Sequence, residues 1–368
     1  MTDRKILILY APCGAGHEKA AQALYNYFKE QGLKDVVLKD ILEFAPAWYR
    51  KTYRDGYYLL TRKFPVLWHT LYQRTEQSVK KTLFKKIWRG SEQRWFSRFY
   101  KYLAETKPSV VLSAHFLPIA LLEGVKRDFE FAILATDYYT HRLWISDIVD
   151  NYFVASEEVK VLLVEKGILA ERITVSGIPI KPIKNFQNNR YQIRRQFGLD
   201  EKLFTVLLLS GAGGVGDIES IIRVLEPLAG SSQMMANTGL NEKLRRQLEK
   251  DFSGSKLKLK IFGFTDDIYR YYYAADMVIS KPGGLTVTEC LNFGLPIFMI
   301  DAIPGQEEEN AKFVAAHQAG VQIKDIIALP GIIKALIDNP AVREEMRNNA
   351  LKIIPKNTNQ KIFEKILS

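Results

Sequence analysis

The chain has 368 residues, of which 47% are hydrophobic and 25% are charged, a composition typical of a globular protein with two domains. No apolar run approaches the roughly 18 residues that span a bilayer, and we expect neither a secretory leader nor a membrane-spanning helix. The two cysteines, Cys13 and Cys290, lie far apart, which argues against a disulfide framework or a metal cluster and favours a reducing cytoplasm.

The first predicted elements are a strand over 4–10, a helix over 17–32 and a second strand over 36–38. A glycine turn, Gly14-Ala15-Gly16-His17, joins the first strand to the helix and places His17 at the helix N-terminus. A neutral imidazole there can remove a proton from an attacking hydroxyl. The alternative is that His17 caps the helix or binds phosphate as a polar group.

The net charge of +11 is concentrated in residues 45–102, which hold 14 Lys and Arg against three acids, while the rest of the chain is balanced. The same segment, predicted to be helical, holds 15 aromatic residues, including four of the five tryptophans. This basic-aromatic segment favours an anionic lipid surface. Single-stranded nucleic acid is a rival partner, and a helical insert with an aromatic core and solvated cations is the alternative without any partner. The residues predicted to meet the membrane are Trp48, Arg62, Lys63, Trp68, Lys85, Lys86 and Trp88.

Three further strands are predicted over 109–113, 129–135 and 152–154. Asp137 follows the second of them, where it can act as a general base, orient His17, or only cap backbone groups. His141 and Trp144, a few residues on, are expected to face an acceptor substrate.

Two prolines in residues 177–183 interrupt this pattern and mark a linker to a second series of strands and helices. We expect an α/β protein with two Rossmann-like parallel-sheet domains, 1–180 and 181–350, facing across a cleft with ligands at the carboxyl ends of the strands. Residues 351–368 are expected to form a helix that packs back towards the first domain. The predicted elements of the second domain are strands over 203–209, 232–236, 256–262, 276–280 and 295–300, and helices over 217–229, 241–251, 266–274 and 286–293.

The loop 211–216 matches the dinucleotide-binding pattern G-x-G-x-x-G, so a dehydrogenase must be considered. The acid expected at the end of the next strand is missing, because residues 234–239 read Met-Met-Ala-Asn-Thr-Gly. A loop in which Gly213 and Gly214 face a diphosphate fits the pattern equally well.

The strongest indication of a nucleotide-sugar site is the pair of segments 280–289 and 304–310. In the first, adjacent glycines open a helix whose N-terminus can receive a diphosphate, and Glu289 lies about one turn inside, where it can accept ribose hydroxyls. In the second, Gln306 and Glu307 can bind hexose hydroxyls. The alternative is a plain Gly-Gly turn with a surface glutamate and an acidic helix start. No Walker A or Asp-x-Asp pattern is present, so we expect neither a metal nor another cofactor.

The chain resembles the monogalactosyldiacylglycerol synthase and processive diacylglycerol glucosyltransferase family of glycosyltransferase family 28, and more distantly the lipid II GlcNAc transferase. The segments that carry the resemblance span nearly the whole chain: 12–21 (PCGAGHEKAA), 136–144, 177–179 (GIP), 263–265 (GFT), 281–289 (KPGGLTVTE) and 304–310 (PGQEEEN).

The resemblance implies a GT-B fold and an inverting transfer from a UDP-sugar. By position, His17 matches the catalytic base, with Asp137 a second candidate, and Gly16 belongs to the acceptor-side motif. For the donor, the resemblance implies that Gly263 and Phe264 bind the uracil and that Glu289 binds the ribose. It also implies that Gly283, Gly284, Leu285 and Thr286 bind the diphosphate and that Gln306 and Glu307 bind the sugar.

We therefore predict a peripheral enzyme on the cytoplasmic face of the cell membrane that transfers a hexose from a UDP-sugar to a diacylglycerol-type lipid, without a nucleic-acid partner. The alternatives are a UDP-GlcNAc-dependent transferase with another lipid carrier, a UDP-sugar 2-epimerase of the same architecture, and a non-catalytic UDP-sugar sensor.

Overall fold

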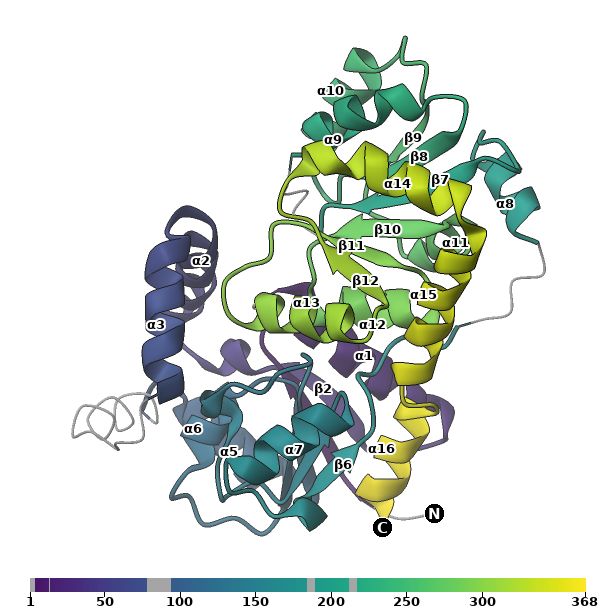
Figure 1. The fold of residues 1–368 in the computed structure, drawn as a ribbon. Helices are drawn as coiled ribbons and strands as arrows, with labels where there is room; N and C mark the ends of the chain where they lie inside the picture. The colour runs from purple at the N-terminus through teal and green to yellow at the C-terminus, as the bar shows by residue number, and fades with distance from the viewer. Residues whose placement is uncertain (1–3, 13, 78–93, 184–188, 212–216) are drawn as a thin grey trace. The chain divides into compact units, whose positions relative to one another are not determined.

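Two parallel sheets of six strands each organise the chain, and every adjacent pair of strands in both sheets is parallel. The computed structural model describes residues 4–12, 14–77, 94–183, 189–211 and 217–368 (Figure 1). The chain divides into unit 1, residues 1–181 with 303–309 and 355–368, and unit 2, residues 182–302 and 310–354. The prediction of an α/β protein with two parallel sheets is confirmed.

The sheet of unit 1 has the strand order β2-β1-β3-β4-β5-β6. Its strand β1, paired with β2 on one side and β3 on the other, is almost entirely apolar and buried, as expected for a parallel strand covered on both faces. The strands are β1 (Ile6–Tyr10), β2 (Val36–Asp40), β3 (Val110–Ser113), β4 (Glu130–Leu134), β5 (Asn151–Val154) and β6 (Ile173–Val175). The helices are α1 (Ala15–Glu30), α2 (Ala47–Lys63), α3 (Pro65–Gln77), α5 (Ser97–Thr106), α6 (Leu117–Leu122), α7 (Glu157–Glu165) and α16 (Thr358–Leu367).

The sheet of unit 2 has the order β12-β11-β10-β7-β8-β9. Its strands are β7 (Phe204–Leu209), β8 (Ser232–Asn237), β9 (Lys258–Phe262), β10 (Met277–Ser280), β11 (Ile297–Met299) and β12 (Gly320–Gln322). Its helices are α8 (Arg190–Gln196), α9 (Ile218–Leu225), α10 (Glu242–Asp251), α11 (Ile268–Ala274), α12 (Gly284–Asn292), α14 (Leu329–Asp338) and α15 (Pro340–Ile353), while α13 (Gln306–Ala316) begins in the 303–309 segment and continues into unit 2.

Two short edge strands, β6 and β12, were not predicted from the sequence. Each has only three residues, too few to show the residue pattern of a strand, and it is recognised by its hydrogen bonds to the neighbouring strand. Gly320 in β12 shows the constraint, because a Cβ at that position would lie 2.1 Å from the carbonyl oxygen of Ile297 on β11.

The C-terminal helix α16 packs against α1 within unit 1. The ring of Phe363 contacts Tyr27 and Phe28, with ring centroids 5.9 and 5.3 Å apart. Close packing of the same segment explains Gly177, which has a φ of +88° and whose Cβ, if it had one, would lie 2.6 Å from Thr358 Oγ1. The glycine of the GIP segment is therefore required by backbone conformation and by the returning C-terminus.

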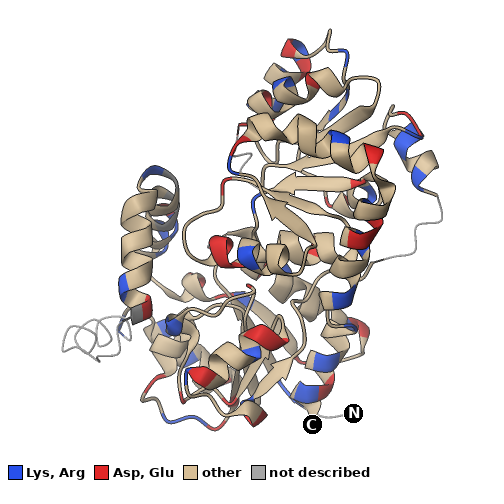
Figure 2. Cartoon of the chain, in the orientation of Figure 1, with Lys and Arg blue, Asp and Glu red and all other residues tan. Residues whose placement is uncertain are grey.

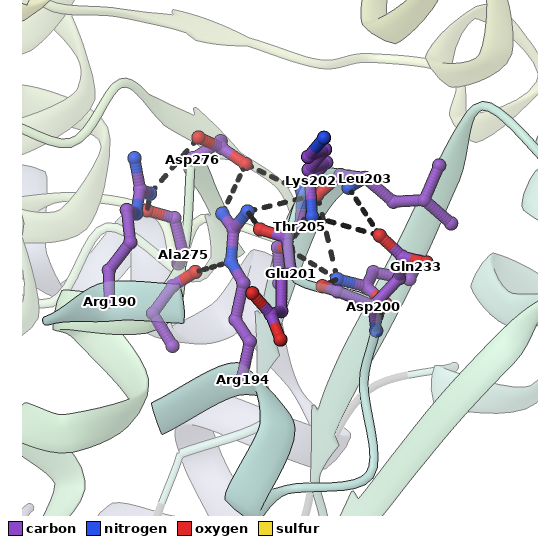
Figure 3. A network of polar contacts seen from close by, with 11 residues as sticks. Arg190, Arg194, Asp200, Glu201, Lys202, Leu203, Thr205, Gln233, Ala275 and Asp276 are labelled. Atoms are coloured by element: carbon purple, nitrogen blue, oxygen red, sulfur yellow. Dashed lines mark hydrogen bonds and ion pairs between the residues drawn. The ribbon is translucent and has the colours of Figure 1, made fainter. Parts of the chain in front are cut away.

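A buried arginine ties α8 to the sheet of unit 2 (Figure 3). Arg194 is 2% exposed and donates to Asp276 Oδ2 at 2.6 Å and to the carbonyl oxygens of Ala274, Glu201 and Leu203. The same Asp276 oxygen accepts from the backbone N–H of Thr205 at 2.7 Å. The guanidinium thus satisfies three carbonyls and one carboxylate that the fold has removed from water.

We expect Arg194→Met to destabilise the protein by about 3 kcal/mol, because it leaves Asp276 and these carbonyls short of donors. Thermal unfolding should show a fall in Tm of roughly 6–12 °C for a unit of this size. Arg195→Met, at the neighbouring exposed position, is the matched control and should change stability by about 0.5 kcal/mol or less. Equal losses in the two variants would contradict the role given to the buried network.

Candidate active site

His17 lies in the first turn of α1, directly beyond the carboxyl end of β1. The turn that leads into the helix depends on Gly14, which has a φ of +98°, a conformation that favours glycine. The sequence predicted that the helix starts at His17. In the structure α1 begins at Ala15, so His17 lies inside its first turn. The imidazole is buried, at 9% exposure.

The side chains around His17 come from three other segments of unit 1. Nδ1 of His17 is 2.7 Å from Oγ1 of Thr136, which follows β4. The ring of His115 lies edge-on to it at 5.2 Å, and the ring of Trp144 lies 5.9 Å away. The carboxyl ends of β1, β3 and β4 thus converge on one imidazole, as parallel strands of one sheet allow.

Burial keeps both histidines neutral. It lowers the pKa of His17 to about 4, although a hydrogen bond to the backbone of Ala114 opposes the shift. Burial also lowers the pKa of His115 well below its usual value, and the nearby His17 adds to this shift. Nδ1 of His115 accepts a hydrogen bond from the N–H of Leu117 at 3.1 Å, which fixes that side of the ring. At neutral pH, His17 is therefore uncharged and able to accept a proton.

The loop 136–144 supplies two of the predicted site residues. Trp144 contacts the ring of His17, so the structure brings these two predicted residues together. Asp137 is half-buried and is the chain neighbour of Thr136. Sequence analysis missed Thr136 as the partner of His17; its position directly after a strand end was the available signal.

His141, predicted to face the acceptor, has both ring nitrogens in hydrogen-bonding contacts inside unit 1. Nδ1 accepts from the N–H of Leu143 at 3.1 Å, and Nε2 lies 3.1 Å from the carbonyl oxygen of Tyr72. The side chain is 6% exposed. In the structure His141 holds its own loop against α3, and its role toward an acceptor stays a prediction.

In unit 2, the glycine turn after β10 opens α12 as predicted. Gly283 occupies the N-cap position, and no side chain of the described residues caps the helix there. Gly284, Leu285 and Thr286 form its first turn, so their backbone N–H groups point out of the helix N-terminus. An N-terminus of this kind is suited to bind a diphosphate.

Glu289 lies one turn further along α12 and is buried, at 8% exposure, which contradicts the interpretation of this residue as a surface glutamate. Its Oε2 accepts a hydrogen bond of 2.9 Å from the hydroxyl of Tyr272 on α11. Tyr272 was not found by sequence analysis. It fixes the orientation of the carboxylate that is predicted to bind the ribose.

Gly263 and Phe264 follow β9 and line a cavity of about 490 Å³ together with Gly239, Arg245 and Tyr271. The carbonyl oxygen of Gly263 accepts from Nδ2 of Asn237 at the end of β8. Phe264 is 53% exposed. The cavity lies at the carboxyl ends of β8 and β9, the edge at which ligands bind in sheets of this type.

Gln306 and Glu307 form the start of α13, in the segment 303–309 of unit 1. Oε2 of Glu307 accepts from the N–H of Ile303 at 2.8 Å, so this carboxylate also closes its own loop. Nε1 of Trp68 on α3 donates to the carbonyl oxygen of Pro304 at 3.0 Å. Asn310, the last residue of the motif, is fully buried and donates to the carbonyl oxygen of Pro282.

Part of the basic-aromatic segment belongs to α2 and α3. Figure 2 shows lysines and arginines on α2 and near the end of α3. Trp48 is 54% exposed, Lys63 is exposed, and Trp68 is half-buried against the 303–309 segment. The predicted residues Gly213, Gly214, Lys85, Lys86 and Trp88 and the side chain of Arg62 lie outside the described residues.

Within the described residues, no helix is both long enough and apolar enough to cross a bilayer. The same residues contain no group of three or more histidine, cysteine, aspartate and glutamate side chains placed to bind a metal ion.

Models of two protein families match consecutive parts of the chain. Residues 17–180 match monogalactosyldiacylglycerol (MGDG) synthase, and residues 205–366 match the glycosyltransferase family 28 C-terminal domain. These ranges contain His17 and the 136–144 loop in the first case and the predicted donor segments in the second.

Relatives that match over most of both chains share one name. The processive diacylglycerol beta-glucosyltransferase of Bacillus cytotoxicus is 30% identical over 355 residues, covering 91% of this chain and 86% of the relative. The protein of the same name from Bacillus cereus is 28% identical over 368 residues, covering 95% and 89%.

Solved structures share the fold at low sequence identity. MurG of Acinetobacter baumannii superposes with a TM-score of 0.63 at 17% identity over 99% of both chains. The MnaA–UDP complex of S. aureus superposes with a TM-score of 0.66 at 12% identity, covering 98% of this chain and 96% of that one. The two parallel sheets thus have the GT-B architecture. Together with the relatives, this shows that the chain belongs to the monogalactosyldiacylglycerol synthase and processive diacylglycerol glucosyltransferase family, within glycosyltransferase family 28, and is a hexosyltransferase.

Proposed function

We propose that this enzyme transfers a hexose from a UDP-sugar to a diacylglycerol-type lipid at the cytoplasmic surface of the cell membrane, with inversion at the anomeric carbon. The family model that matches residues 17–180 is named monogalactosyldiacylglycerol synthase, and the relatives are named diacylglycerol glucosyltransferases. Both names describe the transfer of a hexose to diacylglycerol. The observation that carries the proposal is the buried, neutral His17 at the N-terminus of α1, hydrogen-bonded to Thr136.

His17 acts as the general base in this proposal. The role requires the tautomer of His17 in which Nδ1 carries the proton and donates to Oγ1 of Thr136. Nε2 then keeps its lone pair and accepts the proton of the lipid hydroxyl as that oxygen attacks the sugar. Asp137, next to Thr136, is the second candidate base. The transfer requires the anomeric carbon of the bound donor to come within reach of the activated lipid hydroxyl.

The groups proposed to hold the nucleotide lie along one edge of the sheet of unit 2, and Gln306 and Glu307 belong to the 303–309 segment of unit 1. The N-terminus of α12 stabilises the diphosphate through N–H groups and the helix dipole, so no metal is needed for this charge. The carboxylate of Glu289 accepts from the ribose, and the loop at Gly263 and Phe264 receives the uracil. Gln306 and Glu307 bind the sugar hydroxyls.

The proposed lipid surface meets α2 and α3. Phe64, Val66, Leu67 and Leu71 are 40–80% exposed, an apolar group beside basic residues such as Lys63. Basic residues near an anionic leaflet contribute about 1 kcal/mol each, and apolar side chains enter the headgroup region.

The proposed reaction is tested by incubating the protein with UDP-glucose, UDP-galactose or UDP-GlcNAc and diacylglycerol vesicles, and resolving the lipid products by mass. We expect a β-glycosyl diacylglycerol from one of these donors. His17→Ala should reduce turnover by about 10²–10⁴-fold, the usual contribution of a general base, while UDP binding remains near that of the unmodified protein. Conversion of the UDP-sugar without any lipid would instead indicate an epimerase, and unimpaired turnover in the variant would remove His17 from the role.

The pH dependence of kcat/KM should reflect the lowered pKa of His17. Because burial disfavours the charged imidazole, its neutral form persists as the pH falls, and the acidic limb should have an apparent pKa near 4. Circular dichroism at each pH serves as the control for unfolding. An acidic limb near 6.5 in folded protein would show that the base is not this buried histidine.

Glu289→Ala should weaken UDP binding by roughly 10–100-fold in titration calorimetry, the loss expected for hydrogen bonds to a charged group. Tyr272→Phe, which frees the carboxylate from its orienting donor, should have a smaller effect in the same direction. Glu344→Ala, at an exposed position on α15, is the control and should leave the affinity unchanged. Unchanged affinity in Glu289→Ala would exclude the ribose assignment.

A further inference from the structure

Glu76 is one of three acidic residues in the basic-aromatic segment, and its carboxylate is turned into unit 1. It lies in the last turn of α3 and its side chain is 18% exposed. Oε1 accepts from Nζ of Lys166 at 2.5 Å and from the hydroxyl of Tyr139 at 2.9 Å. Oε2 accepts from the backbone N–H of Arg142 at 2.9 Å. Both oxygens are thus bound by donors from outside α3.

Lys166, the C-cap of α7, completes this cluster. Its ammonium group also donates to the carbonyl oxygen of Thr140 at 3.1 Å and lies 4.8 Å from the centre of the Tyr139 ring. Burial alone would raise the pKa of Glu76, but the hydrogen bonds from Lys166, Arg142 and Tyr139 outweigh it and lower the pKa. The carboxylate is therefore ionised at neutral pH, and the contacts are charge-assisted.

A second contact joins the same turn of α3 to the same loop. Nδ1 of His141 accepts from Leu143, so the ring proton is on Nε2, which donates to the carbonyl oxygen of Tyr72 at 3.1 Å. The same nitrogen lies 3.3 Å from Oγ1 of Thr75 and from Oε2 of Glu76. The end of α3 is therefore fixed to residues 139–142 through both main-chain and side-chain groups.

The two ends of the loop 136–144 contact the proposed base. Thr136 meets Nδ1 of His17 at 2.7 Å, and the ring of Trp144 packs 5.9 Å from its ring. The opposite, N-terminal part of α3 carries exposed apolar side chains, Val66 at 80% and Leu67 at 49%. One helix thus has an exposed apolar end and an end fastened to the loop that positions His17.

We propose that Glu76 is a positioning residue that couples docking of α3 on an anionic lipid surface to the alignment of the loop 136–144 around His17. This inference rests on the proposed function, because it assumes a lipid acceptor and His17 as the base. When α3 is docked on the lipid surface, the Glu76 carboxylate holds Tyr139, Arg142 and Lys166 in place. The loop that contains Tyr139 and Arg142 then keeps Thr136 and Trp144 against His17. Glu76 itself does not touch the reacting atoms.

The test compares Glu76→Gln with the unmodified protein on two acceptors: diacylglycerol in phosphatidylcholine vesicles, with or without phosphatidylglycerol, and a short-chain diacylglycerol dissolved without vesicles. We expect phosphatidylglycerol vesicles to activate the unmodified protein. In Glu76→Gln this activation should be lost through a roughly tenfold or larger fall in kcat, because the neutral amide cannot form the charge-assisted hydrogen bonds that the carboxylate forms. KM for the UDP-sugar, sedimentation with vesicles and turnover of the soluble acceptor should stay near those of the unmodified protein.

Glu105→Gln is the matched control, because Glu105 lies on α5 of the same unit, is 62% exposed and pairs only with Lys101 among its described contacts, at 3.7 Å. It should retain full activation. Lys166→Met should reproduce the loss, and the double variant should be no worse than either single variant, as expected for groups that act through one contact. If Glu76→Gln fails to fold in a thermal scan, Tyr139→Phe removes one donor and should show a smaller loss of activation.

The outcomes separate this inference from the function on which it rests. If the unmodified protein glycosylates no diacylglycerol, the proposed function fails. If it does so but Glu76→Gln keeps full activation by anionic vesicles, or loses activity equally on both acceptors, the coupling is refuted while the function stands.

Discussion

The contact between His17 and Thr136 joins the first turn of α1 to the loop after β4 at the proposed acceptor-side site. Its two atoms are 2.7 Å apart and belong to residues 119 positions apart in sequence, one in the first turn of α1 and the other just beyond β4. Parallel strands bring these positions to the same sheet edge, and burial then determines the chemistry. A buried imidazole with a pKa of about 4 is neutral under cellular conditions, so it can receive a proton without first having to lose one.

At the proposed donor site, the ends of parallel strands again bring the binding groups to one edge of a sheet, but these groups are helix N–H groups and a carboxylate. The N-terminus of α12 lies beyond β10 and is left without a capping side chain among the described residues, which makes its N–H groups available to an anion. The buried Tyr272 holds the Glu289 carboxylate at one oxygen. A diphosphate, a ribose and a hexose present negative charge and hydroxyl groups, so helix N–H groups and fixed carboxylates are the donors and acceptors that they need.

Between the proposed lipid surface and the base lies a small set of polar contacts around Glu76. Because the basic-aromatic segment is strongly basic, Glu76 can be interpreted as an acidic residue that only balances nearby charge. Its three strong donors come from the 136–144 loop and from α7, so its function in the fold is to connect elements that are separate in sequence. The same helix also donates from Trp68 to the segment that carries Gln306 and Glu307.

The sequence by itself determined the α/β class, most strands and the glycine turns, and it suggested the residues of the two proposed sites. These features are local: apolar runs, glycine before a helix, and a carboxylate one turn inside it are visible in a window of about ten residues. Only the tertiary structure revealed Thr136 beside His17, Tyr272 beside Glu289, the internal role of His141 and the inward-facing Glu76. Each of these depends on a partner 17 to 119 residues away, and no local pattern specifies which of many polar side chains such a partner will be. The short strands β6 and β12 also became apparent only in the tertiary structure. They are recognised by their pairing with β5 and β11, and their residues show no strand pattern of their own.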